Sequence, residues 1–357
     1  MSSNFGDKLK ISIFGQSHSQ AIGVVIDGLP AGVEIDMDKV YKFMARRAPG
    51  QNKYSTQRKE KDVPQILSGL FEGKTCGAPL CAIIENTDTR SQDYKNIKDV
   101  PRPSHADFTA FIKHGGANDF RGGGHFSGRL TAPLCFAGAV CMQILERSNI
   151  TIGAHILQIS DISDFCLDPV FVSASELEEI KEKDFPVIND PFGEDMQARI
   201  LEAKNDGDSV GGVIECCVVG LPVGIGNPMF DGIENKISSA IFAIPAVKGI
   251  EFGNGFDACS IFGSQNNDEF YVDNESVKTK TNNSGGILGG ISNGMPLLFN
   301  VGIKPTPTIS KEQNSINLFT KESEKLKVHG RHDPCIVPRA VACVEAATAI
   351  ALLDLML

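Results

Sequence analysis

The stretch GGGHFSGRLTAP, residues 122–133, places three glycines directly before His125, Phe126 and Arg129. Glycine loses much conformational freedom when it is ordered, so consecutive glycines indicate that the backbone must approach something closely. Bare backbone N–H groups beside a guanidinium suit an anion. A flexible surface turn is the alternative interpretation.

A histidine elsewhere, His18, stands beside Ser17 in FGQSHSQAIG at the end of an apolar run. Histidine titrates closest to neutrality, so it can donate or accept a proton at working pH. Neighbouring residues on a strand point to opposite faces, and the chain has no GxSxG elbow, so a serine hydrolase is disfavoured. His18 is therefore a candidate proton donor, with a turn residue as the alternative.

Two further segments combine a proton carrier with charged neighbours. His105 lies in RPSHADF between Arg102 and Asp107, and Asp333 lies in GRHDPC behind an arginine and a histidine. His155, by contrast, lies in an apolar strand-like run and is interpreted as structural. We therefore take His105 and Asp333 as candidate functional residues.

The arginines concentrate in unusual segments. Nine of the eleven occur in stretches that carry glycine, proline or histidine, at positions 46, 47, 58, 90, 102, 121, 129, 331 and 339. Arginine binds phosphate and carboxylate through two parallel hydrogen bonds. This distribution predicts a pocket for a small polyanion, and scattered surface salt bridges are the alternative.

The composition excludes several classes of protein. A net charge of −10 and a pI near 5.3 argue against a nucleic-acid coat, which needs a basic face. No apolar run reaches the roughly 20 residues of a membrane helix. No secretory signal is visible in the first residues, so the cytoplasm is the expected compartment. The ten cysteines form no CxxC pair and mostly lie in apolar runs, which indicates buried reduced thiols and no metal site.

The glycine-rich runs match no common nucleotide motif. Neither GxxxxGK[ST] nor GxGxxG after a strand occurs. The run SGGILGGISNGMP is followed by a strand-like segment, which would leave Lys304, Thr306 and Thr308 just beyond the strand end, where a phosphate or a ring edge could bind.

Hydrophobic periodicity predicts a mixture of strands and helices in one interwoven domain. Strands are expected at 9–15, 21–28, 63–71, 79–86, 151–160, 211–221, 259–264 and 296–304. Helices are expected at 37–48, after a cap at Asp36, and at 127–149 and 337–357. The region from about 160 to 208 is interpreted as a peripheral excursion, with an exposed helix at 173–186 behind a capping box and a second, amphipathic helix from Met196.

Together these segments make the chain resemble the chorismate synthase family. Ten motifs occur in the family's order across residues 5 to 355: FGQSHSQAIGVVIDGLP, RRAPGQNKYSTQRKEKD, NTDTRSQDY, RPSHADF, FRGGGHFSGRLTA, AIPAVKGIEFG, GSQNNDEF, SGGILGGISNG, IKPTPTIS and GRHDPCIVPRAVACVEA. An ordered set of this size is far more specific than any one motif.

The resemblance implies an α+β fold, a β-α-β sandwich in which antiparallel sheets enclose helices, in a single domain over 1–357 that assembles as a homotetramer. It implies a lyase that eliminates phosphate from 5-enolpyruvylshikimate 3-phosphate in a 1,4-anti sense to give chorismate, the last step of the shikimate pathway. It also implies reduced FMN, which donates an electron transiently and recovers it. The arginine surplus in an acidic chain suits such anionic ligands.

The resemblance also implies roles for individual residues. His18, with Ser17 beside it, matches a general acid near the substrate phosphate, His105 a histidine near the flavin ring, and Asp333 a group that helps to remove the C6 proton. Matches for substrate binding are Arg47, Arg129 and Arg339, with Arg46 as a weaker candidate. Matches for FMN binding are His125, Phe126, Ser127, Pro245, Ala246, Gly289, Lys304, Pro305, Thr306, Pro307, Thr308 and Arg331.

Several positions depart from the family's usual pattern. The family often reads RRRPG where this chain has Ala48 in RRAPG. It often has an arginine at the position of Lys53. It often reads KPTSS where this chain reads KPTPT, with Pro307 in place of a serine. Pro245 replaces an asparagine, which removes an amide and a backbone donor. GGGRSSARE becomes GGGHFSGRL, so a permanent cation is replaced by His125 and FMN binding is expected to depend more strongly on pH.

Two questions stay open at this level. A catalytically impaired relative that binds flavin and anions in a regulatory or assembly role is the alternative function, motivated by the changed FMN contacts. Arg47 and Lys53 match candidates for a nicotinamide-dinucleotide contact, so NADPH could reduce the flavin. Because no nucleotide motif is visible, the sequence favours an external flavin reductase.

Overall fold

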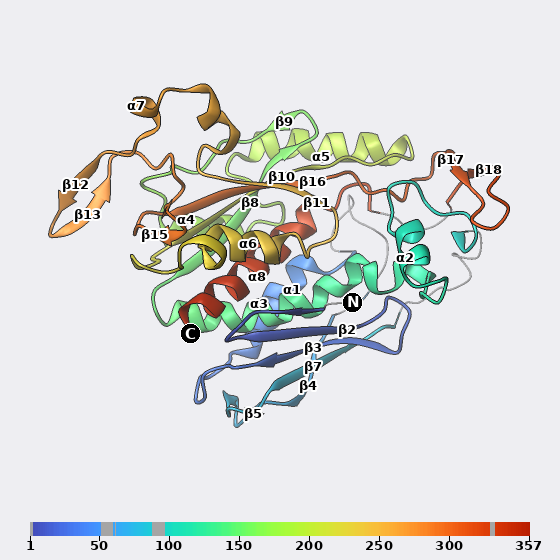
Figure 1. The fold of residues 1–357 in the computed structure, drawn as a ribbon, viewed down its shortest axis with the longest axis horizontal. Helices are drawn as coiled ribbons and strands as arrows, with labels where there is room; N and C mark the ends of the chain where they lie inside the picture. The colour runs from blue at the N-terminus through green and yellow to red at the C-terminus, as the bar shows by residue number, and fades with distance from the viewer. Residues whose placement is uncertain (1–2, 51–59, 61, 88–96, 329–332) are drawn as a thin grey trace.

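Two five-stranded antiparallel sheets face each other across a layer of helices (Figure 1). The computed structural model describes residues 3–50, 60, 62–87, 97–328 and 333–357. One cluster of buried apolar side chains joins both sheets and the helices between them. The expected arrangement of antiparallel sheets that enclose helices is confirmed.

The first sheet has the strand order β1-β2-β3-β7-β4. Its strands are β1 (Asn4–Phe5), β2 (Lys10–Gly15), β3 (Ala21–Asp27), β4 (Gln65–Ser68) and β7 (Leu80–Glu85). In β3, Ile22, Val24 and Ile26 are buried, because alternate residues of a strand share one face, and here that face packs on the helices.

The second sheet has the strand order β11-β16-β10-β8-β9. Its strands are β8 (Thr151–Ile159), β9 (Ile162–Ser163), β10 (Gly212–Val219), β11 (Val247–Phe252) and β16 (Leu297–Ile303). Cys216 of β10 joins the main core, whereas Cys217 faces the opposite side and packs under Leu177. That opposite side is covered by α4 (Ala174–Lys181) and α5 (Asp190–Asn205), as Figure 1 shows.

The helical layer consists of α1 (Met37–Arg47), α3 (Thr131–Glu146), α6 (Ile233–Ile241) and α8 (Val337–Met356). Asp36 caps α1 by accepting from the backbone N–H groups of Asp38 and Lys39. The apolar stretch Arg121–Glu146 is long enough to cross a membrane by length and composition, but 83% of its most apolar window is buried inside the protein. It is therefore the core helix α3 with the turns before it.

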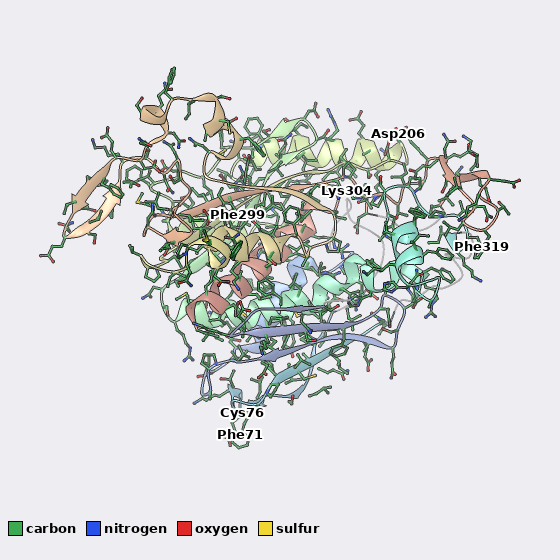
Figure 2. All side chains as sticks on the ribbon, in the orientation of Figure 1. Phe71, Cys76, Asp206, Phe299, Lys304 and Phe319 are labelled. Atoms are coloured by element: carbon green, nitrogen blue, oxygen red, sulfur yellow. The ribbon has the colours of Figure 1, made fainter. Side chains whose placement is uncertain are left out.

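The remaining elements lie at the ends of the sandwich. They are β5 (Leu70–Phe71), β6 (Lys74–Thr75), α2 (Asp107–Lys113), α7 (Gly263–Asn266), β12 (Phe270–Asp273), β13 (Ser276–Thr279), β14 (Ile287–Leu288), β15 (Ile291–Ser292), β17 (Gln313–Ile316), β18 (Ser323–Leu326), and the 3-10 turns η2 (Arg121–Phe126), η3 (Gly128–Leu130), η4 (Met229–Asp231) and η5 (Gly255–Ser260). The β12–β13 hairpin extends from one end, and α2 lies near β17 and β18 at the other (Figure 1). Figure 2 shows Phe299 in the interior and Phe71 at the rim.

Three sequence expectations differ from the structure. The strand expected at 259–264 is wrong, since η5 and α7 occupy that region. The second peripheral helix begins at Asp190 instead of Met196. Asn189 caps the helix at this earlier position, although the sequence Asp-Pro-Phe-Gly that follows is typical of a turn. The first, α4, is not exposed all round, because Leu177 and Ile180 are buried, although its capping by Ser173 is confirmed.

Candidate active site

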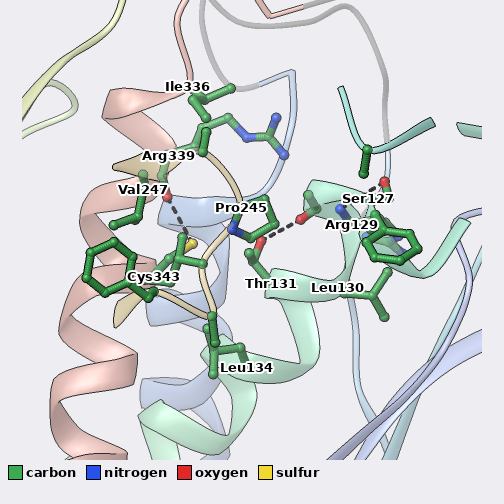
Figure 3. A pocket seen from close by; sticks show the side chains of 18 of the residues that line it. Ser127, Arg129, Leu130, Thr131, Leu134, Pro245, Val247, Ile336, Arg339 and Cys343 are labelled. Atoms are coloured by element: carbon green, nitrogen blue, oxygen red, sulfur yellow. Dashed lines mark hydrogen bonds between the residues drawn. The ribbon is translucent and has the colours of Figure 1, made fainter. Parts of the chain in front are cut away.

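A cavity of about 920 Å³ lies at one end of the helical layer. Its walls come from the end of α1, the turns η2 and η3, the start of α3, the turn between α6 and β11, the loop after β16 and the start of α8. In Figure 3, Arg339 enters from α8 and Arg129 from η3, with Pro245 on the turn before β11. The volume is that of a site for one or two small organic ligands.

Most residues predicted from the sequence line this cavity. They are Arg47, His105, His125, Phe126, Ser127, Arg129, Pro245, Ala246, Lys304, Thr306, Pro307, Thr308, Asp333 and Arg339. They come from segments up to about three hundred residues apart in the chain. The fold therefore brings into one cavity what the sequence shows as separate motifs.

Other predicted residues lie elsewhere. Arg46 points away from the cavity and forms a two-pronged ion pair with the buried Glu345, at 2.5 and 2.9 Å. Residues that do not line the cavity are Ser17, His18, Gly289 and Pro305. Lys53 and Arg331 lie outside the described residues.

The glycine run is packed between the two candidate histidines. A Cβ at Gly122 would lie 2.5 Å from the Ser17 hydroxyl oxygen and 2.6 Å from His18 Cε1, and one at Gly123 would lie 3.1 Å from His105 Cε1. Gly122 and Gly123 also adopt φ angles of +58° and +83°, which favour glycine. The run is thus a fitted wall and not a flexible surface turn.

Three arginines meet at the cavity, of which Arg47 and Arg129 are buried and Arg339 has a side chain that is 18% exposed. Arg47 and Arg129 both donate to the carboxylate of Asp62, with Arg47 Nη1 at 2.5 Å from Oδ2. Burial would raise the pKa of Asp62, but the two guanidinium groups hold it below its usual value. Arg339 donates to Asp333 at 2.5 Å and to the backbone oxygen of Arg47 at 2.9 Å. Carboxylates therefore fix all three guanidinium groups in place.

A second cluster surrounds His105. Its Nδ1 lies 2.6 Å from Asp107 Oδ1, and Asp107 also accepts from Arg102 Nε at 2.7 Å. Nδ1 also lies 3.0 Å from Arg102 Nη2, so this ring nitrogen is shared between the Asp107 carboxylate and the Arg102 guanidinium. Burial lowers the pKa of His105, while Asp107 opposes that shift. Arg102 also donates to Thr308 Oγ1 at 3.1 Å, which connects the histidine to the predicted FMN-binding loop.

That loop presents groups suited to a phosphate. Lys304 donates to the Ser104 backbone oxygen at 2.6 Å, and burial and then the neighbouring Lys248 lower the pKa of Lys304. Both lysines line the cavity, and the buried Thr306 hydroxyl there has no hydrogen-bond partner among the described residues. Two cations that repel each other beside an orphaned hydroxyl fit an anionic group.

The remaining wall is largely apolar. Phe126 and Pro245 line it, and Ala246 adopts an unusual φ of +74° while its backbone oxygen accepts from Lys304 N. Backbone held in this sparsely populated region is frequent at ligand sites. A loop with groups suited to a phosphate, beside an apolar surface, fits FMN, which combines a phosphate with a flat ring.

His125 is oriented by two hydrogen bonds. Its Nδ1 lies 2.7 Å from the Gly15 backbone oxygen and its Nε2 lies 2.7 Å from the Ser3 hydroxyl. Since a carbonyl oxygen only accepts, Nδ1 must donate, and the ring is fastened to the first sheet. The adjacent Phe126 ring lies 6.4 Å from the ring of His114.

Some residues of the site were not assigned from the sequence. Arg102 and Asp107 flank His105 in RPSHADF, and Lys248 lies within AIPAVKGIEFG, so their motifs carried a signal. Asp62 could not be found this way, because its role depends on two arginines from other segments. Among the described residues, no group of three or more His, Cys, Asp or Glu side chains is placed to hold a metal ion.

The fold and the site together define an enzyme-type cavity for small polyanions within an α+β sandwich. Comparison with known proteins specifies the family. The family model of chorismate synthase matches residues 9–357. A chorismate synthase of Lancefieldella parvula is 46% identical over 99% of this chain and 96% of its own length, and one of Methanococcus maripaludis is 44% identical over the same shares.

A solved structure agrees with these matches. A crystal structure of chorismate synthase superimposes with a TM-score of 0.78 at 28% identity and covers 99% of this chain and 92% of its own. The chain belongs to the chorismate synthase family.

Proposed function

We propose that the protein converts 5-enolpyruvylshikimate 3-phosphate to chorismate and phosphate in this cavity, as a carbon–oxygen lyase. The observation that carries the proposal is the meeting of Arg47, Arg129 and Arg339 in the lining of one cavity, in a chain with a net charge of −10. Such a local concentration of guanidinium groups suits a substrate with a phosphate and two carboxylates. No feature of the described residues favours the catalytically impaired alternative.

The three arginines would bind and orient the substrate anions. Each is already held by hydrogen bonds to a carboxylate, a hydroxyl or a backbone oxygen, so little side-chain freedom is lost on binding. Arg46 is proposed to act at a distance, because its pairing with Glu345 joins α1 to α8 and fixes the neighbouring Arg47.

The proton transfers are assigned to three residues. The reaction removes a proton from C6 and releases phosphate from C3. Asp333, held by Arg339, would accept the C6 proton, and His18 would protonate the departing phosphate from behind Gly122, with Ser17 beside it. Arrival of anions in the cavity raises the pKa of His105, because opposite charge favours the protonated ring. His105 would therefore take up a proton when ligands bind.

FMN would be held by the loop from Lys304 to Thr308 and by Phe126, Ser127, Pro245 and Ala246. When bound in its reduced form, it supplies an electron transiently and recovers it, so the reaction shows no net redox change. The protein's own contribution is to bind the phosphate with Lys304 and the Thr306 hydroxyl, and to exclude water with its apolar wall. Gly289 and Arg331 are retained as further contacts.

Assembly, compartment and reductant are part of the same proposal. We propose a cytoplasmic homotetramer. The exposure of Phe230, Phe256 and Phe262, at 84%, 80% and 79%, supports association with other copies of the chain, since large exposed aromatic side chains mark association surfaces. Sedimentation tests the assembly. We propose that an external reductase reduces the flavin, in preference to NADPH bound through contacts at Arg47 and Lys53.

An anaerobic assay tests the function. The purified protein is mixed with 5-enolpyruvylshikimate 3-phosphate and FMN reduced by dithionite, and released phosphate and chorismate are measured. Product should form with reduced FMN and not with oxidised FMN. A parallel sample with NADPH instead of dithionite tests for intrinsic reduction. Absence of product with dithionite-reduced FMN would refute the proposal.

A further inference from the structure

Two cysteines meet in the wall of the active-site cavity. The sulfur atoms of Cys135 on α3 and Cys343 on α8 are 3.8 Å apart. Cys135 is fully buried, and Cys343 is 3% exposed and lines the cavity (Figure 3). All ten cysteines are free thiols. In this pair, one sulfur lies in the core and the other belongs to a residue that lines the cavity.

The two helices that carry the pair are unusually close. Three residues further along each helix, a Cβ at Gly138 would lie only 2.3 Å from the Cα of Ala346. The backbones of α3 and α8 are therefore in near contact one turn from the cysteines. A disulfide bond of about 2.05 Å would require the two sulfur atoms to move closer from 3.8 Å, between helices that are already in close contact.

The surroundings of the two sulfurs differ. The groups facing Cys343 are Cys135, Arg47, Thr131 and Arg339. A hydrogen bond from Cys135 and the positive charge of Arg47 lower the pKa of the Cys343 thiol, against the effect of burial. Burial raises the pKa of Cys135. Since the thiolate is the reactive form, Cys343 is the attacking sulfur and Cys135 is the resolving thiol.

We propose that Cys343 and Cys135 form an oxidisable dithiol in the cavity wall, a modification site for small hydroperoxides that closes to a disulfide and inactivates the site. The modification itself is independent of the proposed function. Only the loss of activity depends on that function.

The chemistry balances in two steps. In the first, the Cys343 thiolate attacks an oxygen of the hydroperoxide, an S–O bond forms, the O–O bond breaks, and the peroxide is reduced to an alcohol or water with the thiol proton. In the second, Cys135 attacks the sulfenic sulfur, the S–S bond forms, and the hydroxyl leaves as water with the Cys135 proton. Sulfur loses two electrons in all.

Inactivation follows from the position of the pair. Cys343 is one helical turn from Arg339 and its sulfur donates to the Arg339 backbone oxygen at 3.5 Å. A sulfenate at Cys343 would place a negative charge beside Arg47 and Arg339, and a disulfide would pull Cys343 toward α3. Either product alters the wall that presents the two guanidinium groups.

Differential thiol labelling tests the proposal without any activity measurement. The protein is treated with hydrogen peroxide, denatured, alkylated, reduced and alkylated again with an isotopically heavy reagent, and its peptides are mapped by mass spectrometry. We expect the heavy label on Cys135 and Cys343, with a cross-linked peptide pair before reduction. Activity should fall in proportion to the cross-linked fraction and return with dithiothreitol.

Variants sharpen the test. Cys343→Ser should abolish the cross-link, and Cys135→Ser should leave a sulfenic acid at Cys343 that dimedone traps. Cys141→Ser is the matched control, because Cys141 lies buried on the same helix and does not line the cavity, and it should behave as the native chain. Heavy label confined to the exposed Cys76, Cys166 and Cys259 in the native protein would overturn the proposal, even if a variant fails to fold.

Discussion

The carboxylate of Asp62 holds two arginines of the cavity together, and its replacement gives the most informative prediction. Asp62 is 1% exposed and accepts from both Arg47 and Arg129, which line the cavity. Asp62→Asn keeps the side-chain shape and removes one negative charge. We expect a less stable protein that binds its anionic substrate more tightly.

The loss of stability can be estimated from the contacts. Removing one partner of a buried ion pair costs about 3–5 kcal/mol, because the other charge stays buried. Arg47 keeps hydrogen bonds to Thr131 Oγ1 and Arg129 keeps one to Asn86 Oδ1. The free energy of unfolding should therefore fall by about 3 kcal/mol, at the lower end of that range, because both arginines keep other hydrogen bonds.

The gain in affinity has the opposite sign. With Asp62 neutral, the cavity presents one more unit of net positive charge to the substrate anions. At an effective dielectric constant of about 20, this change strengthens the binding of a nearby anion by about 1–2 kcal/mol. KM should therefore be roughly ten-fold lower in Asp62→Asn than in the native protein. Turnover at saturating substrate should change less than KM, because uniform binding does not lower the barrier from the bound state.

The stability difference should also depend on pH. The pKa of Asp62 lies below its usual value in the folded protein, so its stabilisation is present above the unfolded-state pKa and is lost as the pH falls through the folded-state pKa. The difference between the native protein and Asp62→Asn is therefore largest at neutral pH and shrinks below about pH 4.

Chemical denaturation at several pH values measures the stability, and steady-state kinetics measure KM. Asp161→Asn is the matched control, because Asp161 pairs with Arg199 at the surface and is 68% exposed. That variant should match the native protein in both assays. An unchanged stability, or a KM that rises in Asp62→Asn, would refute the reasoning about the shared carboxylate.

Three further predictions concern the histidines and the glycine run. Asp107→Asn removes the negative charge beside His105 Nδ1 that favours the protonated ring, so turnover should fall by about 10²-fold and the pH–rate limb that reports His105 should move to lower pH; an unchanged pH profile would show that the pair is only structural. Gly122→Ala should lower turnover strongly and melting temperature modestly, because its Cβ would lie 2.6 Å from His18 Cε1, and a fully active variant in a kinetic assay would contradict this packing. FMN affinity measured by fluorescence quenching should vary less with pH in His125→Arg than in the native protein, and equal pH dependence would exclude His125 as the cause.

Local sequence was sufficient for the longest strands and helices, whereas β11 and α6 were not predicted and the sandwich itself was expected only from the family resemblance. The alternation in β3 and the long apolar runs of α3 and α8 follow directly from periodicity, since each element needs one or more buried faces. The sequence was less informative at 259–264, where an apolar pair among small residues suggested a strand but the chain forms short helical turns that leave Phe262 79% exposed. Such short segments have too little periodicity to decide between states.

The site was predicted in part. His105 and its charged neighbours Arg102 and Asp107 can be recognised in RPSHADF, because all three residues lie in one short segment of the sequence. Arg46 and Arg47 are adjacent in sequence and both were candidates for substrate binding, Arg46 the weaker one, yet Arg46 pairs with Glu345 and Arg47 lines the cavity. Successive residues of a helix point about 100° apart, so only the packing of α1 determines which arginine reaches the ligand.

The sequence by itself determined the family resemblance and the charged neighbours within RPSHADF, whereas the need for glycine at positions 122–124 follows from the φ angles and close contacts of the structure. The tertiary structure alone decided which charges meet. Asp62 bridges Arg47 and Arg129, and Cys135 meets Cys343, across separations of up to about two hundred residues. The physical reason is that periodicity and turn chemistry are local, whereas a buried ion pair or thiol pair depends on how distant segments pack against one another.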